Sequence, residues 1–214
     1  MSVSTKQKIL DAAIRLFNEN GLCNVRLQQI ADETGISVGN LAYHFKNKEA
    51  IVNQAYEMLF VEFSEILTAY LRYPDLRDMD NQLELYFAFF KKYQFYLTDL
   101  FEVERSFPGI IAQWHQCVQK MLAQIRKRID FNMQRAILAP ETHPGSYDLL
   151  ANNIWMTITF WIPQRILRGL PIDEASFREA VWSQLLPWFT YKGREEYQQL
   201  IQPSIMAIRN GERK

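Results

Sequence analysis

The chain has 214 residues, a formal net charge of zero and a hydrophobic fraction of 48%. This length suits one or two domains with a substantial core, and the zero net charge gives no overall signal for nucleic-acid binding. No apolar run reaches the roughly 18 residues that a membrane helix requires, and charged residues interrupt the N-terminus where a secretory signal would be apolar. We therefore expect a cytoplasmic protein that does not enter a membrane.

The two cysteines, Cys23 and Cys117, lie far apart and belong to no CxxC pair. A structural disulfide is not expected in a reducing compartment. We interpret both as ordinary buried thiols, with a redox sensor as the alternative. The three histidines show no metal-binding spacing, and the chain has neither a Gly-rich phosphate loop nor a nucleophile motif. The sequence therefore predicts neither an enzyme nor a bound cofactor.

Helical periodicity dominates the chain and no alternating strand pattern is present, which predicts an all-α fold. A capping box at Ser4 starts the first helix, and Asn20-Gly21 ends it. A second helix is predicted over about 27–34 and a third over about 38–44. These three helices form a predicted N-terminal head.

The turn between the second and third helices carries the strongest signal. Ala31 is small enough to let the two helices approach closely, and Gly35 can adopt the left-handed conformation that ends a helix. Ser37 can cap the third helix, while Leu41 and Phe45 give that helix one buried edge. Such a helix-turn-helix places a helix in the DNA major groove, so we expect a DNA-binding protein.

The outer face of this third helix is the predicted DNA surface. Residues 36–48 contain two lysines and one histidine but no carboxylate, so this region is locally positive. Gly39 lets the backbone approach DNA, and Asn40 can offer its amide to an adenine edge. The candidate DNA contacts are Ser37, Val38, Gly39, Asn40, Tyr43, His44, Lys46 and Lys48. Two alternatives stay open: the tyrosine and histidine can cover the helix junction, and the lysines can be solvated charges.

The remaining elements follow in order. A fourth helix, capped by Asn47, is predicted to run to about Leu71 with apolar positions at Ile51, Ala55, Met58, Leu59 and Val61. A polar connection over 74–81 leads into an aromatic-rich segment over 83–107. Further helices are predicted over about 110–137 and over 147–168, the latter with a kink at Pro163. Another helix is predicted to start after a cap at Asp173, and a last one over 195–208, which Pro203 must bend or interrupt. We expect a DNA-binding domain over 1–48 and a larger helical domain over 49–214.

The second domain is rich in aromatic residues. With a few polar groups these can line a pocket for a small hydrophobic or aromatic ligand, or they can simply form core. The candidate pocket residues are Phe87, Phe90, Trp114, His115, Asn152 and Trp155. Trp161, Trp182 and Trp188 are candidates for a dimer interface, where aromatic residues are enriched, with core as the alternative.

The chain up to about Ala55 resembles the tetracycline-repressor (TetR/AcrR) family of bacterial regulators. The matching motifs are Ile9-Leu10-Asp11-Ala12-Ala13 with Leu16-Phe17 and Gly21, Ile30-Ala31 with Gly35-Ile36-Ser37, Gly39 with Leu41, His44-Phe45, and Asn47-Lys48-Glu49. The resemblance implies an all-helical homodimer with a three-helix DNA-binding head and a larger domain that binds a small molecule and dimerises.

The chain departs from the family pattern at two places. Ala42 stands where a tyrosine is usual, and Arg26-Leu27 stands where the second helix usually begins with threonine. In the family, the hydroxyl of that tyrosine contacts a DNA phosphate. Tyr43, next to Ala42, is the candidate to replace this contact. Arg26 can contact a phosphate through its charge, which adds it to the candidate DNA contacts.

The sequence therefore predicts a sequence-specific transcriptional regulator: a ligand-responsive repressor that binds a palindromic operator as a homodimer. One helix makes few base contacts, so two heads are expected on half-sites about 34–36 Å apart or at a multiple of one helical turn. The competing hypothesis is a helical small-molecule-binding or interaction protein with a weak or vestigial DNA-binding head. A steep salt dependence of DNA affinity would argue against that alternative.

Overall fold

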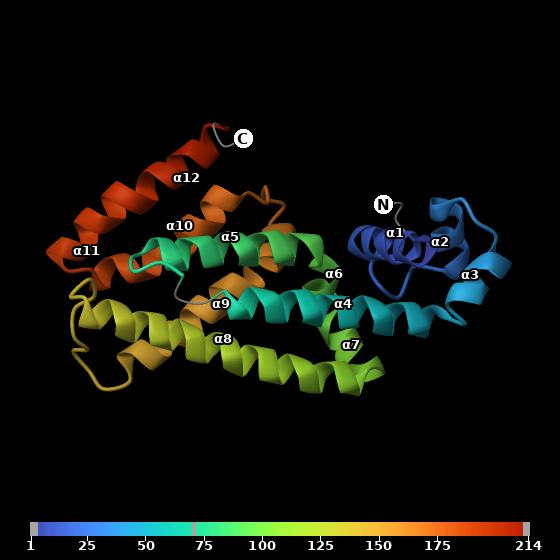
Figure 1. Cartoon of the computed structure of the whole chain (residues 1–214), viewed down its shortest axis with the longest axis horizontal. Helices are drawn as coiled ribbons and strands as arrows, with labels where there is room; N and C mark the ends of the chain where they lie inside the picture. Colours follow the sequence, from blue (N-terminus) through green and yellow to red (C-terminus); the bar gives the residue numbers. More distant parts are fainter. Residues whose placement is uncertain (1–3, 70–71, 212–214) are drawn as a thin grey trace. The chain divides into compact units, whose positions relative to one another are not determined.

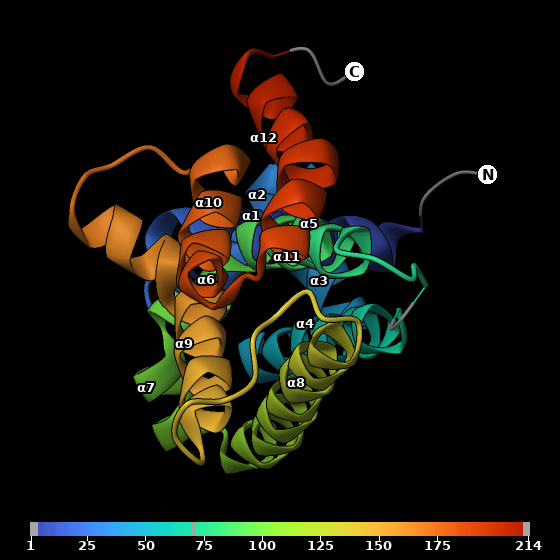
Figure 2. The same cartoon turned by 90° about the vertical axis from the view of Figure 1, so that its left-hand side faces the viewer.

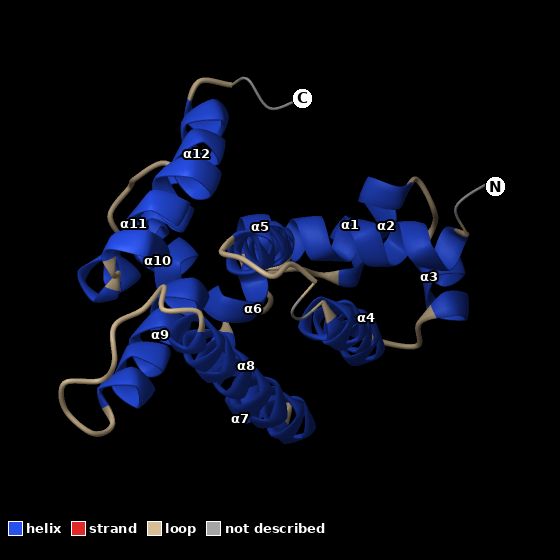
Figure 3. Cartoon of the chain, turned by 60° about the vertical axis from the view of Figure 1, so that its left-hand side comes forward, coloured by secondary structure: helices blue, strands red, loops and turns tan. Residues whose placement is uncertain are grey.

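The computed structural model describes residues 4–69 and 72–211. Within these ranges the regular structure is helical and no strand forms, as Figure 3 shows, which confirms the predicted all-α fold. The α-helices, labelled in Figure 1, are α1 Thr5–Asn20, α2 Leu27–Thr34, α3 Val38–His44, α4 Lys48–Thr68, α5 Arg77–Lys92, α6 Gln94–Thr98, α7 Leu100–Ser106, α8 Pro108–Gln134, α9 Ser146–Leu167, α10 Glu174–Leu185, α11 Tyr191–Glu196 and α12 Gln202–Arg209. A 3-10 helix at Leu186–Trp188 and a π-helix at Tyr197–Ile201 complete the set.

The chain packs as two compact units. The first unit contains residues 1–64 and 93–114, and the second contains 65–92 and 115–214. The compact unit that holds the three head helices thus also includes α6, α7 and the start of α8. The functional boundary at residue 48 stays a prediction.

In the first unit, α1 packs against α2 and α6, and α2 packs against α3. The Ser4 hydroxyl accepts the Gln7 backbone N–H at 3.2 Å, which confirms the predicted cap of α1. The side chains of Ile9, Ala13 and Phe17 have no exposed surface, so the apolar stripe of α1 is the centre of the head's core. Short helices such as α2 and α3 are marginal in isolation and depend on packing against such a core for their stability.

In the second unit, α5 packs against both α9 and α10. Two buried aspartates near its N-terminus hold neighbouring helices through ion pairs. Asp78 Oδ2 accepts Arg128 Nε at 2.9 Å, and Asp80 Oδ1 accepts Arg178 Nε at 3.0 Å. Because the charges are paired and hydrogen-bonded, these buried groups fix how α8 and α10 pack on α5.

Four details differ from the sequence predictions or refine them. Val61, predicted on the apolar stripe of α4, is 62% exposed. The described part of α4 ends at Thr68, and the predicted end at Leu71 lies outside the described residues. The aromatic-rich segment does not form a single helix, because α5 ends at Lys92 and α6 begins at Gln94 after Tyr93. The long helix that follows spans Pro108–Gln134, close to its predicted range.

The last predicted helix is interrupted, as expected from Pro203. In Figures 1 and 2, α11, the π-helix and α12 follow one another along nearly one line. A proline has no N–H to donate to the carbonyl four residues earlier, so the ordinary α pattern cannot continue through it. The wider π turn over Tyr197–Ile201 lies just before the proline, which occupies the first turn of α12.

No helix among the described residues combines the length and apolar character needed to cross a bilayer. Within the same residues, histidine, cysteine and carboxylate side chains form no group of three that could hold a metal ion.

Candidate DNA-binding surface and ligand cavity

The turn between α2 and α3 is closed by backbone hydrogen bonds around one left-handed residue. Gly35 has φ 69° and ψ 30°, a conformation that costs glycine little because it has no Cβ. Its N–H donates to the Asp32 carbonyl at 3.1 Å, and the Ile36 N–H donates to the Ala31 carbonyl at 3.0 Å. This paired pattern is a Schellman motif, which ends α2 and directs the chain into α3. The predicted role of Gly35 is confirmed.

The first turn of α3 is capped as the sequence predicts. Ser37 Oγ accepts the Asn40 backbone N–H at 3.1 Å. Leu41 is fully buried and Phe45 is 4% exposed, so these two side chains anchor one side of the helix in the head's core. The opposite side is therefore fixed in orientation by local packing.

The exposed side of α3 carries several of the predicted DNA contacts. Gly39 and Asn40 are exposed, and Tyr43 is 86% exposed. Val38 and His44 are half-buried, and the His44 ring meets the Tyr43 ring edge-on with centroids 5.3 Å apart. This contact is compatible with both hypotheses for Tyr43 and His44, namely that they cover the helix junction or that they contact DNA.

The candidate cations around α3 are not equivalent. Lys46 and Arg26 are exposed, with Arg26 at the N-cap of α2. Lys48 is half-buried, and its Nζ donates to the Cys23 carbonyl at 3.1 Å, which ties the α1–α2 loop to the start of α4. Burial lowers the pKa of Lys48 from its usual value. Lys46 and Arg26 are thus the cations free to meet a phosphate without giving up this intramolecular bond.

Cys23 corrects the prediction of two buried thiols, because its side chain is exposed, whereas Cys117 is half-buried. Partial desolvation and a hydrogen bond to Glu102 raise the pKa of the Cys23 thiol. A raised pKa keeps this sulfur in the less reactive thiol form, which does not favour the redox-sensor reading.

The hydrogen bonds between the α6–α7 corner and the head helices were not predicted from the sequence. Asp99 Oδ2 accepts the Leu22 backbone N–H at 2.6 Å. Asn18 Oδ1 accepts the Phe95 backbone N–H at 2.9 Å, and the Phe95 ring packs against the rings of Phe17 and Tyr56 at 5.5 and 5.6 Å. This corner therefore clamps the end of α1 and the loop before α2. The hydrogen-bonded pairs are 77 residues apart in sequence, which no local pattern reveals.

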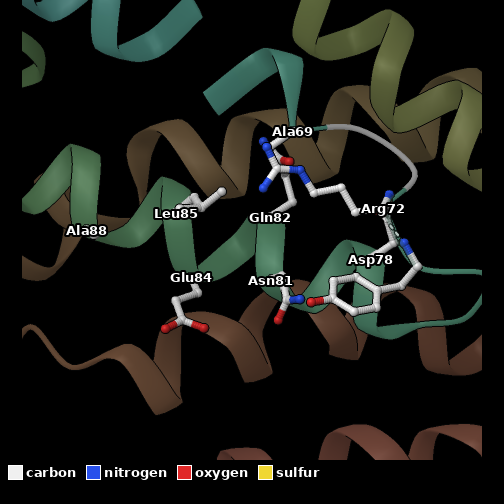
Figure 4. Close-up of a pocket in the computed structure, with 9 residues that line it drawn as sticks. Ala69, Arg72, Asp78, Asn81, Gln82, Glu84, Leu85 and Ala88 are labelled. Atoms are coloured by element: carbon white, nitrogen blue, oxygen red, sulfur yellow. Dashed lines mark hydrogen bonds between the residues drawn. The ribbon is translucent and has the colours of Figure 1, made fainter. Parts of the chain in front are cut away.

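A cavity of about 360 Å³ lies in the second unit where the chain passes from α4 to α5 (Figure 4). We call it the corner cavity. Its lining combines one arginine, two carboxylates, two amides, one tyrosine and three apolar side chains. These residues are Ala69, Arg72, Tyr73, Asp78, Asn81, Gln82, Glu84, Leu85 and Ala88.

The residues predicted to line a pocket are not gathered around the corner cavity. Phe87 and Phe90 are buried in the second unit, where Phe87 packs against Trp161 and Phe177. Trp114 is 6% exposed and packs in the first unit against Phe63 and Tyr96. His115 and Asn152 are exposed. Trp155 is half-buried, and its indole N–H is buried with no partner among the described residues. A pocket formed by these six residues stays a prediction.

Two of the three tryptophans proposed for a dimer interface, Trp161 and Trp182, lie in the second unit's interior. Trp182 is fully buried and its Nε1 donates to Asp80 at 3.0 Å, so it has no surface to offer a second copy. Trp161 is 5% exposed. Trp188 is half-buried and packs against the Tyr147 ring at 4.9 Å. For Trp182 and Trp161 the core alternative is the one that the packing supports.

An apolar stripe on α9 is exposed instead. Leu149, Met156, Phe160 and Leu167 are 68%, 52%, 38% and 87% exposed. Their spacings of seven, four and seven residues place them on one side of the helix. The spacing of these apolar residues is visible in the sequence. We call these four residues the α9 stripe.

Comparison with known proteins agrees with this architecture. The family described as bacterial regulatory proteins of the tetR family matches residues 9–55, and the family of TetR bacterial transcriptional repressors matches residues 61–197. The negative regulator IcaR of the icaADBC biofilm operon in Staphylococcus epidermidis is 27% identical over 124 residues, which cover 58% of this chain and 60% of that protein. The probable transcriptional regulator YttP of Bacillus subtilis is 38% identical over 61 residues, 27% of this chain and 30% of that protein. The matches thus span roughly one third to three fifths of these curated relatives.

Solved structures resemble the chain over nearly its whole length. A TetR-family transcriptional regulator from Marinobacter aquaeolei has a TM-score of 0.79 at 25% identity, covering 99% of this chain and 100% of that one. The complex of SmeT with triclosan has a TM-score of 0.60 at 14% identity, covering 87% and 92%. SmeT is the repressor of a multidrug efflux pump in Stenotrophomonas maltophilia. The two family matches together cover the head and most of the remaining helices, and the chain therefore belongs to the TetR family of bacterial regulatory proteins.

Proposed function

We propose that this chain is a transcriptional repressor that binds a palindromic DNA operator as a homodimer and responds to a small molecule. The observation that carries the proposal is the exposed side of α3. Leu41 and Phe45 anchor the helix, while Gly39, Asn40 and Tyr43 face outward with exposed Lys46 beside them. A rigid helix with small and polar residues outward suits insertion into a major groove.

The contacts divide by the information they carry. The Asn40 amide is the candidate for reading a base edge, where adenine offers a matching donor and acceptor. Tyr43, Lys46 and Arg26 are the candidates for phosphate contacts, which position the head without reading sequence. Ala42 is exposed next to Tyr43, so the tyrosine stands beside the position where the family usually places one.

The α9 stripe supports the dimer. Four large apolar side chains on one side of a long helix are costly to leave in water, and a symmetric pairing of two copies would cover them. Two heads joined in this way can engage two half-sites, which supplies the affinity and specificity that one short helix lacks.

The ligand response is supported by the corner cavity and by a relative. SmeT, a structural neighbour, is known as a complex with triclosan. In the present chain α4 is one continuous helix that starts at Lys48, directly after the head, and ends before the corner cavity. A ligand that prefers one of two conformations would shift DNA affinity by its differential affinity for them.

Fluorescence anisotropy with duplex DNA from upstream of the chain's own gene tests the proposal. At two salt concentrations we expect tight binding that weakens steeply with salt, because phosphate contacts release counterions. Asn40→Ala should cost about 1–3 kcal/mol on the preferred sequence. Lys46→Ala should weaken binding to all sequences and lower the salt slope by about 1.

The matched control is Asn53→Ala, which removes an exposed asparagine on α4 in the same unit but away from α3. It should leave the affinity unchanged. Weak binding that ignores sequence, or equal losses in Asn40→Ala and Asn53→Ala, would contradict DNA reading by α3 and favour a head that no longer recognises DNA.

A further inference from the structure

The corner cavity has a wall built for an apolar group. Leu85 is 38% exposed on α5, Ala88 lies one turn further along the helix, and Ala69 faces them from the end of α4. Figure 4 shows Leu85 and Ala88 on one side of the cavity and Arg72 on the other. The volume of about 360 Å³ is near the lower end of the roughly 300–1,000 Å³ usual for ligand sites. The space suits a small molecule with a short apolar body.

The cavity also contains one available cation. Among the described residues, no carboxylate lies within ion-pairing distance of the Arg72 guanidinium. In Figure 4 its side chain reaches from the loop after α4 toward Gln82. The backbone N–H of Arg72 donates to Asp78 Oδ1 at 2.6 Å, and this bond holds the backbone from which the Arg72 side chain extends. Its five N–H donors can therefore meet an anionic group at a defined place.

The carboxylates at the cavity restrict the charge of that anion. Asp78 is already neutralised by Arg128, which pairs with its Oδ2 at 2.9 Å. Gln82, which also lines the cavity, is occupied too, because it donates to the Ile66 carbonyl and accepts from Arg128. Glu84 adds a further negative side chain to the lining. One negative charge can be matched by Arg72, whereas a second would face carboxylates with no further free cation in the lining.

We propose that the corner cavity binds a small amphipathic monocarboxylate, with its carboxylate on Arg72 and its apolar body against Leu85, Ala88 and Ala69. A planar carboxylate accepts two parallel N–H bonds from a guanidinium, which fixes the orientation of the bound molecule. The site lies between the end of α4 and the start of α5, so an occupant contacts Ala69 on one side and Leu85 and Ala88 of α5 on the other. An effect of binding on DNA affinity rests on the proposed function, but binding itself does not.

The test is isothermal titration calorimetry of the full chain with octanoate. Three compounds with the same eight-carbon chain separate the contribution of the charged group from that of the apolar chain. Octan-1-ol has no charge, octylamine has a positive charge, and octyl phosphate has a larger negative charge than octanoate. We expect octanoate to bind at least tenfold more tightly than any of the three. Arg72→Ala should weaken octanoate binding at least tenfold, and Leu85→Ser should weaken it without changing the preference for an anion.

Arg72 and Leu85 are both surface-accessible, so neither change is expected to prevent folding, and circular dichroism verifies this. The matched control is Arg105→Ala, which removes an exposed arginine of the first unit and should leave binding unchanged. Failure of octanoate to bind, unchanged binding in Arg72→Ala, or equal binding of octan-1-ol would overturn the proposal. Equal binding of octyl phosphate would overturn the restriction to one charge.

DNA binding is measured separately by anisotropy with and without octanoate. Octanoate binding that depends on Arg72 but leaves DNA affinity unchanged would confirm the site and contradict its coupling to the head. Absence of any DNA binding would contradict the proposed function while leaving the calorimetric result intact. The two failures are therefore distinguishable.

Discussion

At the scale of single residues, Asp99 joins the α6–α7 corner to the loop that precedes the second head helix. Its carboxylate accepts the Leu22 N–H, and Leu22 itself is 4% exposed. Removing the acceptor leaves a buried donor unpaired, which costs about 1–3 kcal/mol. We predict that Asp99→Ala lowers the free energy of unfolding in urea by this amount. Asp99→Asn keeps an acceptor oxygen in place and should lose clearly less, so equal losses in the two variants would contradict this role.

Tyr86 provides a residue-scale prediction about pH. Burial raises the pKa of its phenol from 10.0 to about 12 in the folded chain. The neutral form is therefore favoured by folding, so its stabilising contribution is complete below pH 10 and is lost as pH rises from 10 toward 12. Over that range the free energy of unfolding should fall by up to about 1.4 kcal/mol per pH unit from this group.

Tyr86→Phe isolates that contribution from those of other groups that titrate at high pH. The variant should lose stability less steeply than the parent chain between pH 10 and 12, measured by urea unfolding at each pH. Parallel curves for the two proteins would show that Tyr86 ionises equally readily in the folded and unfolded chains.

At the scale of elements, α11 lies against the loop that follows α8 through a close backbone contact. A Cβ added to Gly193 would overlap the carbonyl oxygen of Ile137, a backbone atom that cannot move aside alone. The Thr190 N–H donates to that same carbonyl at 3.0 Å, so the contact is fixed from two sides. Gly193→Ala should therefore destabilise the chain by about 1–3 kcal/mol in urea unfolding.

Gly109→Ala is the matched control, since Gly109 lies in α8 and a Cβ there would meet nothing within 4 Å. It should be neutral or stabilise the chain by up to about 1 kcal/mol, because alanine loses less backbone freedom on folding. Destabilisation of the same size in both variants would mean that the Ile137 contact is not what excludes a side chain at Gly193.

Local features of the helices could be predicted from the sequence, whereas contacts between distant residues could not. The α2–α3 turn was predictable because Gly35, Ser37 and Leu41 act on neighbours within one or two turns, so the pattern itself contains the geometry. The starts of α1 and α10 followed from their caps, Ser4 and Asp173, for the same reason. In contrast, Asp99 and Leu22 are 77 residues apart in sequence, so no local pattern links them. Hydrophobic periodicity predicts that a residue is buried but does not identify the residues it packs against.

The tryptophans illustrate that last limit. Trp161 and Trp182 have the spacing of residues on packed helices, which fits a core and a dimer interface equally well. Only the three-dimensional packing shows that Trp182 bonds Asp80 inside the second unit, while Met156 and Phe160 on α9 are left exposed. The corner cavity was likewise hidden, because Arg72, Asn81 and Leu85 form no recognisable motif.

At the scale of the whole molecule, the α9 stripe makes a prediction about assembly. A charge placed in a paired apolar surface is costly to bury, so Phe160→Glu should convert the proposed dimer into monomers. Light scattering coupled to size-exclusion chromatography measures the mass, and anisotropy should show a matching loss of affinity for a two-half-site operator. The control Val61→Glu changes an exposed apolar residue outside the stripe and should leave the mass unchanged. A dimer in both variants would place the interface elsewhere.

Selection from a random duplex library tests whether two copies of α3 read DNA sequence. We expect enrichment of an inverted repeat whose half-sites are about one helical turn, or a multiple of one, apart. We also expect Asn40→Ala to change the preferred base at one position of each half-site. A library that remains random after repeated rounds, or an enriched site that Asn40→Ala selects unchanged, would show that α3 does not read the sequence in this way.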